Sequence, residues 1–422
     1  MNDSAEFYDA LETRDPQQRE EALLQALPKQ VAHAQRSTTA WARRLAGIDP
    51  RELTSRAALA RLPVTRKHDL AEEQKAHRAS DPFGGFAAIG WRAMRASGAL
   101  RVFQSPGGLY EPEGGVPDYW RIARAVYAAG FRRGDLAHNS FSYHLTPAGS
   151  MMETGAHAVG CTVFPGGVGN TELQLQAMLD LRPDGYLGTP SFLKILLDKA
   201  DAMGRALPHL RKALVSGEAF PPSLRQAFAA RGIDGYQCYA TADVGLIAYE
   251  TAAREGLVLD EQVIVEIVRP GTGDPVPDGE VGEVVVTTLN PDYPLVRFGT
   301  GDLSAVLPGR CPTGRTNTRI RGWMGRADQT TKVRGMFVHP SQVADVLARH
   351  PELRRARLVV SGAVAQDRMT LHAEVEGAPE GLALHVAETV REITKLRCEV
   401  QLVSPGTLPN DGKVIEDARR YD

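Results

Sequence analysis

The sequence has few cysteines, little net charge and no long apolar run, and each shortage excludes a class of protein. Its four cysteines lie far apart in 422 residues, which excludes a disulfide framework and any CxxC zinc or redox pair. Lys and Arg total 49 against 51 Asp and Glu, so the net charge of −2 argues against nucleic acid or an anionic membrane as the main partner. No apolar run reaches the roughly 18 residues of a membrane-spanning helix. The acidic first residues lack the features of a signal peptide, so we expect a cytoplasmic protein.

From residue 118 onward, helical and strand patterns alternate along the chain. The predicted helices cover 118–130, 148–159, 171–181, 190–203 and 222–231, and the predicted strands cover 135–141, 161–164, 185–188, 212–216 and 235–240. Alternation at this spacing indicates crossover connections and a largely parallel sheet. Just before this region, LPVTRKHDL at 62–70 predicts a turn followed by a helix, with Thr65 as its candidate N-cap.

After residue 245 the pattern changes twice. Strand-like segments at 262–268 and 281–289 flank a PDGE turn and predict antiparallel hairpins. From about residue 326, helices at 340–349 and 382–396 mix with strands at 356–361, 369–375 and 398–403. We therefore predict an α/β fold. A large N-terminal domain (1–325) would hold parallel-sheet layers and a β region, and a small mobile α+β domain (326–422) would follow it.

Common catalytic signatures are missing. GTLPNDGKV at 406–414 departs from a Walker A loop in the spacing of its glycines and in Val414, which stands where Ser or Thr is required. GGVGNTE at 166–172 lacks the third glycine of a dinucleotide fingerprint. A GxSxG elbow is also absent, which weakens an α/β-hydrolase interpretation.

Six segments in a fixed order carry the specific signal. They are the 160–196 stretch with its GGVGNTE and GTPS sequences, SGEAF at 216–220, YATADVG at 239–245, RFGTGDLS at 297–304, GRADQTTKVRGMFVHPSQV at 325–343 and LPNDGK at 408–413. Together they resemble the phenylacetate-CoA ligase branch of the adenylate-forming (acyl-CoA synthetase) superfamily. The resemblance covers nearly the whole chain and implies ATP or AMP, Mg²⁺ and coenzyme A as cofactors. The domain over 1–325 would then be the AMP-binding domain, and 326–422 the lid.

The resemblance also assigns residues to the nucleotide. Asp302 would accept both ribose hydroxyls, which suits an ionised carboxylate, and Tyr239 would stack on adenine. Asp243 stands where relatives carry a magnesium-binding glutamate. The remaining nucleotide-binding candidates are Ser216, Gly217, Glu218 and Ala240, with Ser105, Gly107 and Gly108 of the phosphate loop. Taken alone, Asp302 is more typical of a solvated turn, and Tyr239 is equally typical of a buried strand.

Residues of the C-terminal segments would carry the chemistry. By resemblance, Lys413 neutralises charge as the adenylate forms, which is electrostatic stabilisation of a transition state. Arg326 would pair with phosphate or ribose oxygen, and Asp328 would be the hinge about which the lid rotates. Lys332 and Arg334 would meet the phosphates of CoA. A lone C-terminal lysine is otherwise a typical solvated surface charge, and Lys332 and Arg334 would also suit a solvated strand face.

The acid would occupy a pocket formed by segments that line it in relatives. Tyr143, His144, Thr189 and Pro190 lie in those segments, and ordinary core packing is the alternative explanation for them. An apolar, aromatic-lined pocket would suit an aryl or arylacetic acid.

One departure from the family pattern stands out in the phosphate loop. Relatives have a Ser/Thr/Gly run ending in Lys-Pro, whereas residues 105–112 here read SPGGLYEP, with Glu111 in the place of the lysine. A carboxylate facing a triphosphate repels it. Either magnesium bridges the two, or Glu111 points outward. CPTGR at 311–315 also lacks the second cysteine that relatives often carry.

The sequence thus predicts an ATP-dependent acid–CoA ligase that forms an acyl-adenylate from an aromatic or other small carboxylic acid. Two alternatives stay open: transfer of the acyl group to an acceptor other than CoA, and a catalytically silent protein that binds nucleotide or acyl-CoA. The resemblance further implies a homodimer.

Overall fold

The computed structural model describes most of the chain, and the chain forms two compact units. The described residues are 6–92, 94–105, 108–327, 329, 331–333, 336–338, 340–362, 367–377, 379–411 and 413–419, with only the backbone described at 332, 336, 337 and 341. The first unit comprises 1–265, 286–298 and 307–322, and the second comprises 266–285, 299–306 and 323–422. The domain division after residue 325 and the mobility of the C-terminal part stay predictions.

The first unit begins with one long helix, several shorter helices and a hairpin. In chain order these elements are η1 (Ala10–Thr13), α1 (Pro16–Ser37), α2 (Thr39–Arg44), η2 (Pro50–Glu52), α3 (Arg56–Ala60), β1 (Thr65–Arg66), α4 (Lys67–His77), β2 (Ala99–Ser105) and β3 (Leu109–Gly114). The prediction of Thr65 as the N-cap of α4 was wrong. Thr65 lies in β1, where its N–H donates to the carbonyl of Arg297, and the cap position falls on Arg66, whose N–H donates to Asp69 Oδ2 at 3.0 Å.

A nine-stranded sheet, of order β14-β15-β10-β9-β8-β7-β6-β4-β5, dominates this unit. Its strands are β4 (Leu136–Asn139), β5 (Thr162–Pro165), β6 (Gly185–Gly188), β7 (Lys212–Val215), β8 (Asp234–Thr241), β9 (Gly245–Glu250), β10 (Leu257–Leu259), β14 (Val306–Leu307) and β15 (Arg319–Ile320). Strands β4 to β8 pair in parallel, and β8, β9, β10 and β15 pair antiparallel. The predicted α/β class and parallel sheet are confirmed.

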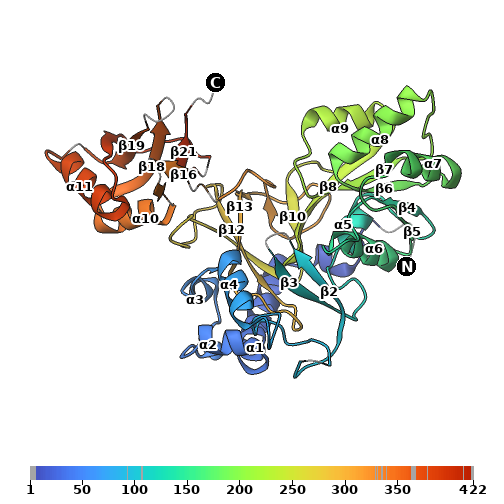
Figure 1. The fold of residues 1–422 in the computed structure, drawn as a ribbon, viewed down its shortest axis with the longest axis horizontal. Helices are drawn as coiled ribbons and strands as arrows, with labels where there is room; N and C mark the ends of the chain where they lie inside the picture. The colour runs from blue at the N-terminus through green and yellow to red at the C-terminus, as the bar shows by residue number, and fades with distance from the viewer. Residues whose placement is uncertain are drawn as a thin grey trace. The chain divides into compact units, whose positions relative to one another are not determined.

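Helices cover both faces of the parallel strands. They are α5 (Ala123–Ala128), α6 (Ala148–Val159), α7 (Thr171–Leu181), α8 (Pro190–Ala202) and α9 (Pro222–Ala229). Figure 1 shows α8 and α9 on one side of β6–β8, and α5 and α6 on the other. The core follows the alternation of strand side chains: Leu187 and Leu214 pack with α5 and α6, whereas Tyr186 packs with α7, α8 and α9. Strands covered on both faces need apolar side chains on both, and Tyr186, Leu187 and Leu214 provide them.

The remaining strands and helices belong to a small sheet and to the C-terminal segments. Strands β11 (Val263–Val268), β12 (Gly282–Thr288) and β13 (Phe298–Ser304) form a sheet with β1 in the order β1-β13-β12-β11. The C-terminal elements are β16 (Thr331–Val333), β17 (Met336–Val338), α10 (Pro340–Arg349), β18 (Leu353–Ser361), β19 (Arg368–Val375), α11 (Leu382–Thr394), β20 (Glu399–Val403) and β21 (Ile415–Asp417). Their four-stranded sheet has the order β20-β19-β18-β21. Within the described residues, no helix is long and apolar enough to cross a membrane.

Candidate active site

The phosphate-loop segment is the turn of the β2–β3 hairpin. Ser105 ends β2, and its carbonyl accepts a hydrogen bond from the N–H of Gly108 at 3.0 Å. Gly108 has a φ of +78°, a conformation that glycine adopts without strain, and a side chain there would meet open space. Gly107, the other predicted glycine of this loop, lies outside the described residues. The hairpin thus leaves open space beside Gly108, and a loop that binds a ligand needs such space.

Glu111 does not point outward, so that explanation of the departure is wrong. The residue is completely buried, and its Oε1 accepts a hydrogen bond from the Ser105 hydroxyl at 2.8 Å. Lys67 completes the cluster: its Nζ lies 3.3 Å from Ser105 Oγ and 3.0 Å from Asp243 Oδ2. Glu111 and Asp243 therefore share a single ammonium group.

The electrostatics of this cluster are unbalanced. Among the described residues, none donates a hydrogen bond to Glu111 Oε2 or to Asp243 Oδ1, although both atoms are buried. Burial, the neighbouring charge of Asp243 and a hydrogen bond between the two carboxyl side chains raise the pKa of Glu111 well above its usual value, and the Ser105 hydrogen bond and Lys67 only partly oppose this. Two carboxyl groups beside one ammonium leave the site short of positive charge.

The sequence interpretation missed Lys67. Lys67 is the first residue of α4, and 176 positions separate it from Asp243, which lies in the turn between β8 and β9. The LPVTRKHDL segment predicts a helix start and marks where the family resemblance begins, but it assigns no role to Lys67. The signal that could have identified Lys67 is its positive charge, because a phosphate loop with Glu111 in place of the family's lysine needs a cation from another segment.

The predicted adenine-side residues follow the carboxyl ends of β7 and β8. The Ser216 hydroxyl donates to the carbonyl of Cys238 at 2.8 Å, which joins the two strand ends. Gly217 has a φ of +82° and lies near Thr189. Tyr239 is buried in β8, and a bulge in the pairing with β9 separates it from Ala240. The carboxyl edge of a parallel sheet is where ligands bind in open α/β folds, so these residues occupy a suitable position.

The predicted acid-pocket residues lie beside this edge. Thr189 caps α8, its hydroxyl accepting from the N–H of Phe192 at 3.3 Å, and Pro190 is the first residue of that helix. The N–H of Ser191 donates to Glu218 Oε1 at 2.6 Å, so the β6 and β7 ends are joined as well.

Tyr143 and His144 follow β4. The Tyr143 hydroxyl donates to Glu153 Oε2 at 2.6 Å and accepts from Asn139 Nδ2 at 2.7 Å. Burial, then the Glu153 carboxylate, raises the pKa of Tyr143. The hydroxyl is therefore fixed by protein groups, whereas the His144 side chain is exposed.

The second unit contains the other group of predicted residues. Arg326 Nη1 lies 2.9 Å from Asp302 Oδ1, and Trp323 Nε1 donates to the same oxygen at 3.1 Å. A cavity of about 200 Å³ brings Arg326 together with Lys413, whose side chain is exposed. Gln329 Oε1 accepts from the N–H groups of Val414 and Ile415, which holds the segment after Lys413 against residue 329.

Three predicted residues are outside what the structure describes. They are Gly107, the hinge candidate Asp328 and the CoA candidate Arg334. Lys332 lies in β16 opposite Phe337, and only its backbone is described. The roles of all four stay predictions.

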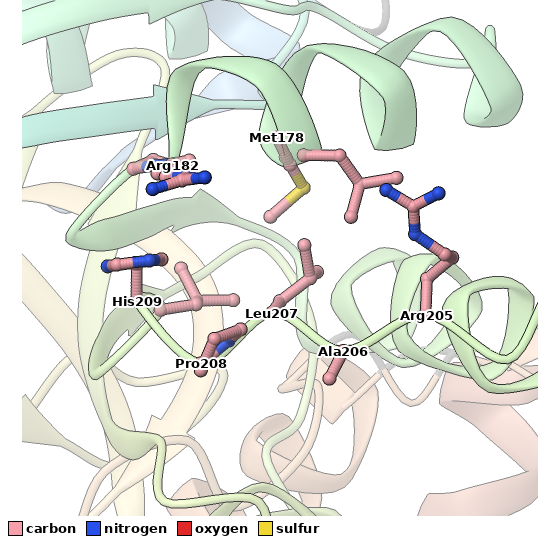
Figure 2. Close-up of a pocket in the computed structure, with 10 residues that line it drawn as sticks. Met178, Arg182, Arg205, Ala206, Leu207, Pro208 and His209 are labelled. Carbon is pink, nitrogen blue, oxygen red and sulfur yellow. The ribbon is translucent and has the colours of Figure 1, made fainter.

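A separate cavity of about 240 Å³ lies where α7 ends and where β6 and β7 begin. Arg182 and His209 lie on one side of it and Arg205 on the other (Figure 2), with Met178 and Leu207 between them. The amino ends of these strands are opposite the edge that holds the predicted site. None of the predicted residues lines this cavity.

Comparisons with known proteins agree with the fold. Residues 132–290 match the family described as AMP-binding enzyme. The crystal structure of 2-hydroxyisobutyryl-CoA ligase in an open conformation, in complex with 2-HIB-AMP and CoA, is similar with a TM-score of 0.72 and 25% identity. The alignment covers 96% of this chain and 92% of that one.

Two relatives in sequence are phenylacetate-coenzyme A ligases. The protein from Aromatoleum evansii is 33% identical over 318 residues, which is 73% of this chain and 70% of that protein. The protein from Pseudomonas putida is 29% identical over 431 residues, covering 96% and 95% of the two chains. The chain therefore belongs to the phenylacetate-coenzyme A ligase family.

Proposed function

We propose that the protein is an AMP-forming acid–CoA ligase for a small aromatic carboxylic acid. The observation that carries the proposal is the convergence of Ser216, Gly217, Glu218 and Thr189 at one edge of the sheet, in a chain of this family. Direct hydrogen bonds from Ser216 to β8 and from Ser191 to Glu218 connect the three strand ends. Family membership alone would leave open whether the site is still assembled; these contacts support a site that is.

The reaction needs no nucleophilic side chain. The carboxylate oxygen of the acid attacks the α-phosphorus of ATP, the bond to the β-phosphate oxygen breaks, and acyl-adenylate and pyrophosphate result. The CoA thiolate then attacks the acyl carbon, so AMP leaves and a thioester forms. The protein contributes positioning and charge neutralisation, which together supply most of the catalysis in such transfers.

Asp302 and Arg326 are proposed to handle the nucleotide's ribose and phosphate. In the structure they pair with each other, and the guanidinium is more than half exposed while the carboxylate is largely buried. An exposed guanidinium is free to turn toward an anion at little cost, because exposed ion pairs contribute only about 0–1 kcal/mol. Arg326 would then bind phosphate oxygen, and Asp302 would accept from the ribose hydroxyls.

Lys413 is proposed to neutralise charge during adenylate formation. Its side chain is exposed and lines the same cavity as Arg326. Its own N–H donates to Asp411 Oδ1 at 3.1 Å and its carbonyl accepts from Arg357 Nε at 3.2 Å, so the backbone is held while the ammonium remains available.

Mg²⁺ fits the carboxylates of the phosphate-loop cluster, since Asp243 has a buried oxygen that no described residue hydrogen-bonds. When bound, the ion would neutralise phosphate charge and favour departure of pyrophosphate. Lys67, held 3.0 Å from Asp243, is proposed to supply the cation that position 111 no longer provides.

The test separates the two half-reactions. Pyrophosphate release from ATP is measured with aryl and alkyl acids, with and without CoA, for the wild type and for Lys413→Ala. The variant should lose acid-dependent pyrophosphate release yet still form thioester from supplied acyl-adenylate. Lys395→Ala, which removes another exposed lysine of the same unit, is the matched control and should match the wild type in both steps. Unchanged adenylate formation in Lys413→Ala would contradict the role of Lys413.

The buried Glu111 favours one alternative, a nucleotide- or acyl-CoA-binding protein without ligase chemistry. The same assay distinguishes it, because such a protein would bind AMP or acyl-CoA but release no pyrophosphate with any acid. Product formation with an acceptor other than CoA would instead support the alternative of acyl transfer to another acceptor. The homodimer is proposed from the family resemblance, and its test is the molar mass in solution.

A further inference from the structure

The Tyr119 hydroxyl apart, three buried side-chain oxygens of the first unit lack a hydrogen-bond partner among the described residues, and they belong to neighbouring side chains. They are Glu111 Oε2 on β3, Asp243 Oδ1 in the β8–β9 turn and the hydroxyl of Tyr293, for none of which the described residues provide a hydrogen bond. Glu111 is completely buried, and Asp243 and Tyr293 are only 5% and 2% exposed. Beyond the effect of burial, the charges of Glu111 and Asp243 raise the pKa of Tyr293, so its hydroxyl senses both carboxylates. An unpartnered buried polar atom destabilises the folded state, and a group of three indicates a missing ligand.

The charge of the group indicates a cation. Lys67 donates to Asp243 Oδ2 and to Ser105 Oγ, and the Ser105 hydroxyl donates to Glu111 Oε1. Each carboxylate therefore has one oxygen satisfied by the protein and one left over. When both carboxyl groups are ionised, as metal binding requires, two carboxylates and one ammonium leave a net charge of −1, which would repel a polyphosphate. A divalent cation changes that to +1.

The chemistry of the available atoms selects a hard ion. Carboxylate and hydroxyl oxygens suit Mg²⁺ and Mn²⁺, and Mg²⁺ in nucleotide sites usually takes only one or two protein carboxylates beside water and phosphate. Among the described residues, no cluster of three or more His, Cys, Asp or Glu side chains forms a closed metal cage. A two-carboxylate site open to further ligands is consistent with this.

We propose that Glu111 and Asp243 together bind a divalent cation of the Mg²⁺ class before any nucleotide arrives. Glu111 replaces the lysine of the phosphate loop with a metal ligand, so this chain recruits a metal where its relatives have a fixed ammonium. Lys67 donates to Asp243 Oδ2 and the Ser105 hydroxyl donates to Glu111 Oε1, so Asp243 Oδ1 and Glu111 Oε2 are the oxygens that would hold the ion. That the ion recruits a polyphosphate rests on the proposed function, whereas the binding of the ion itself does not.

The experiment uses Mn²⁺ as a paramagnetic probe, without nucleotide or acid. Free Mn²⁺ is measured by electron paramagnetic resonance in titrations of the full chain, and Mg²⁺ is added as a competitor. The wild type should bind one Mn²⁺ that Mg²⁺ displaces. Glu111→Gln and Asp243→Asn should each weaken binding by about tenfold or more, since even supporting residues of metal sites have effects of that size.

Glu113→Gln is the matched control. Glu113 lies two residues further along β3 and is just as buried, but Arg101, Trp120 and Ser150 hydrogen-bond its two oxygens. Because it has no oxygen to spare, its replacement should leave the Mn²⁺ affinity unchanged. Thermal unfolding in EDTA and in Mg²⁺ identifies any variant that fails to fold.

Thermal stability provides a second readout, because Glu111→Gln should weaken metal binding without lowering stability in EDTA. In EDTA, Glu111→Gln should be at least as stable as the wild type, because the amide removes the repulsion with Asp243. Added Mg²⁺ should stabilise the wild type and leave the variant unchanged. A wild type that binds no Mn²⁺ without nucleotide would overturn the proposal and indicate a proton shared between the two carboxyl groups. Equal affinity in the wild type and Glu111→Gln would overturn it as well. Neither result affects the ligase assignment, which is measured by pyrophosphate release.

Discussion

Replacement of Lys67 by methionine should destabilise the first unit, and the loss should depend on Glu111. Lys67 Nζ lies 3.0 Å from Asp243 Oδ2, and the Asp243 side chain is 3% exposed while that of Lys67 is 37% exposed. At that distance the Coulomb energy is about 5 kcal/mol with an effective dielectric constant of 20, which sets a ceiling. Methionine preserves the apolar stem but leaves two buried carboxylates without a counter-charge.

The expected loss lies between two measured classes of ion pair. Breaking a fully buried pair costs about 3–5 kcal/mol, and exposed pairs contribute about 0–1 kcal/mol. With one partner buried and the other partly solvated, we expect a loss of roughly 1–3 kcal/mol in the free energy of unfolding. In a Glu111→Gln background the loss should shrink by about 1 kcal/mol, since only one carboxylate then needs the ammonium.

The assay is urea unfolding in EDTA, followed by tryptophan fluorescence, for the wild type, both single variants and the double variant. The difference between the two Lys67→Met effects gives the coupling energy. Equal losses in the two backgrounds would refute the idea that Lys67 serves both carboxylates. No loss in either background would show that the 3.0 Å contact contributes nothing.

Three further changes test other parts of the first unit. Thr189→Ala should cost about 1 kcal/mol of unfolding free energy by removing the N-cap of α8, and Thr189→Ser should restore it. Gly217→Ala should cost about 1–2 kcal/mol because its φ of +82° strains any side chain, although the added methyl group would make only ordinary contacts. Burial raises the pKa of Asp118 from 3.8 to about 7, although two backbone hydrogen bonds oppose the shift. The folded state therefore binds the proton more tightly than the unfolded state, and the free energy of unfolding should fall as the pH rises from about 4 to 7. Urea unfolding at pH 5 and pH 8 should therefore show a smaller decline for Asp118→Asn than for the wild type, and an equal decline would contradict the shift.

Much of the fold could be predicted because its signals are local. The predicted bounds of 148–159, 171–181 and 185–188 coincide with α6, α7 and β6. Periodic apolar residues, the left-handed Gly160 at the end of α6 and Pro190 at the start of α8 all act within a few positions of one another. The wrong cap at Thr65 came from such a local rule, because pairing with the distant Arg297 determines its conformation.

The site was predictable in its parts but not in its connections. Motif order located Asp243 and the loop at 105–112, and it identified Glu111 as unusual. Whether Glu111 is buried, and which cation accompanies it, depends on α4 contacting a turn 176 positions away. No periodicity or spacing encodes that contact, so Lys67 emerged only with the three-dimensional structure.

The most direct test of the central claim is pyrophosphate release from Mg-ATP by the wild type with a panel of aromatic and aliphatic acids, with and without CoA. We expect release with a small aromatic acid, turnover that CoA increases, and AMP and acyl-CoA in equal amounts. Binding of AMP without pyrophosphate release for any acid would contradict the proposed ligase activity.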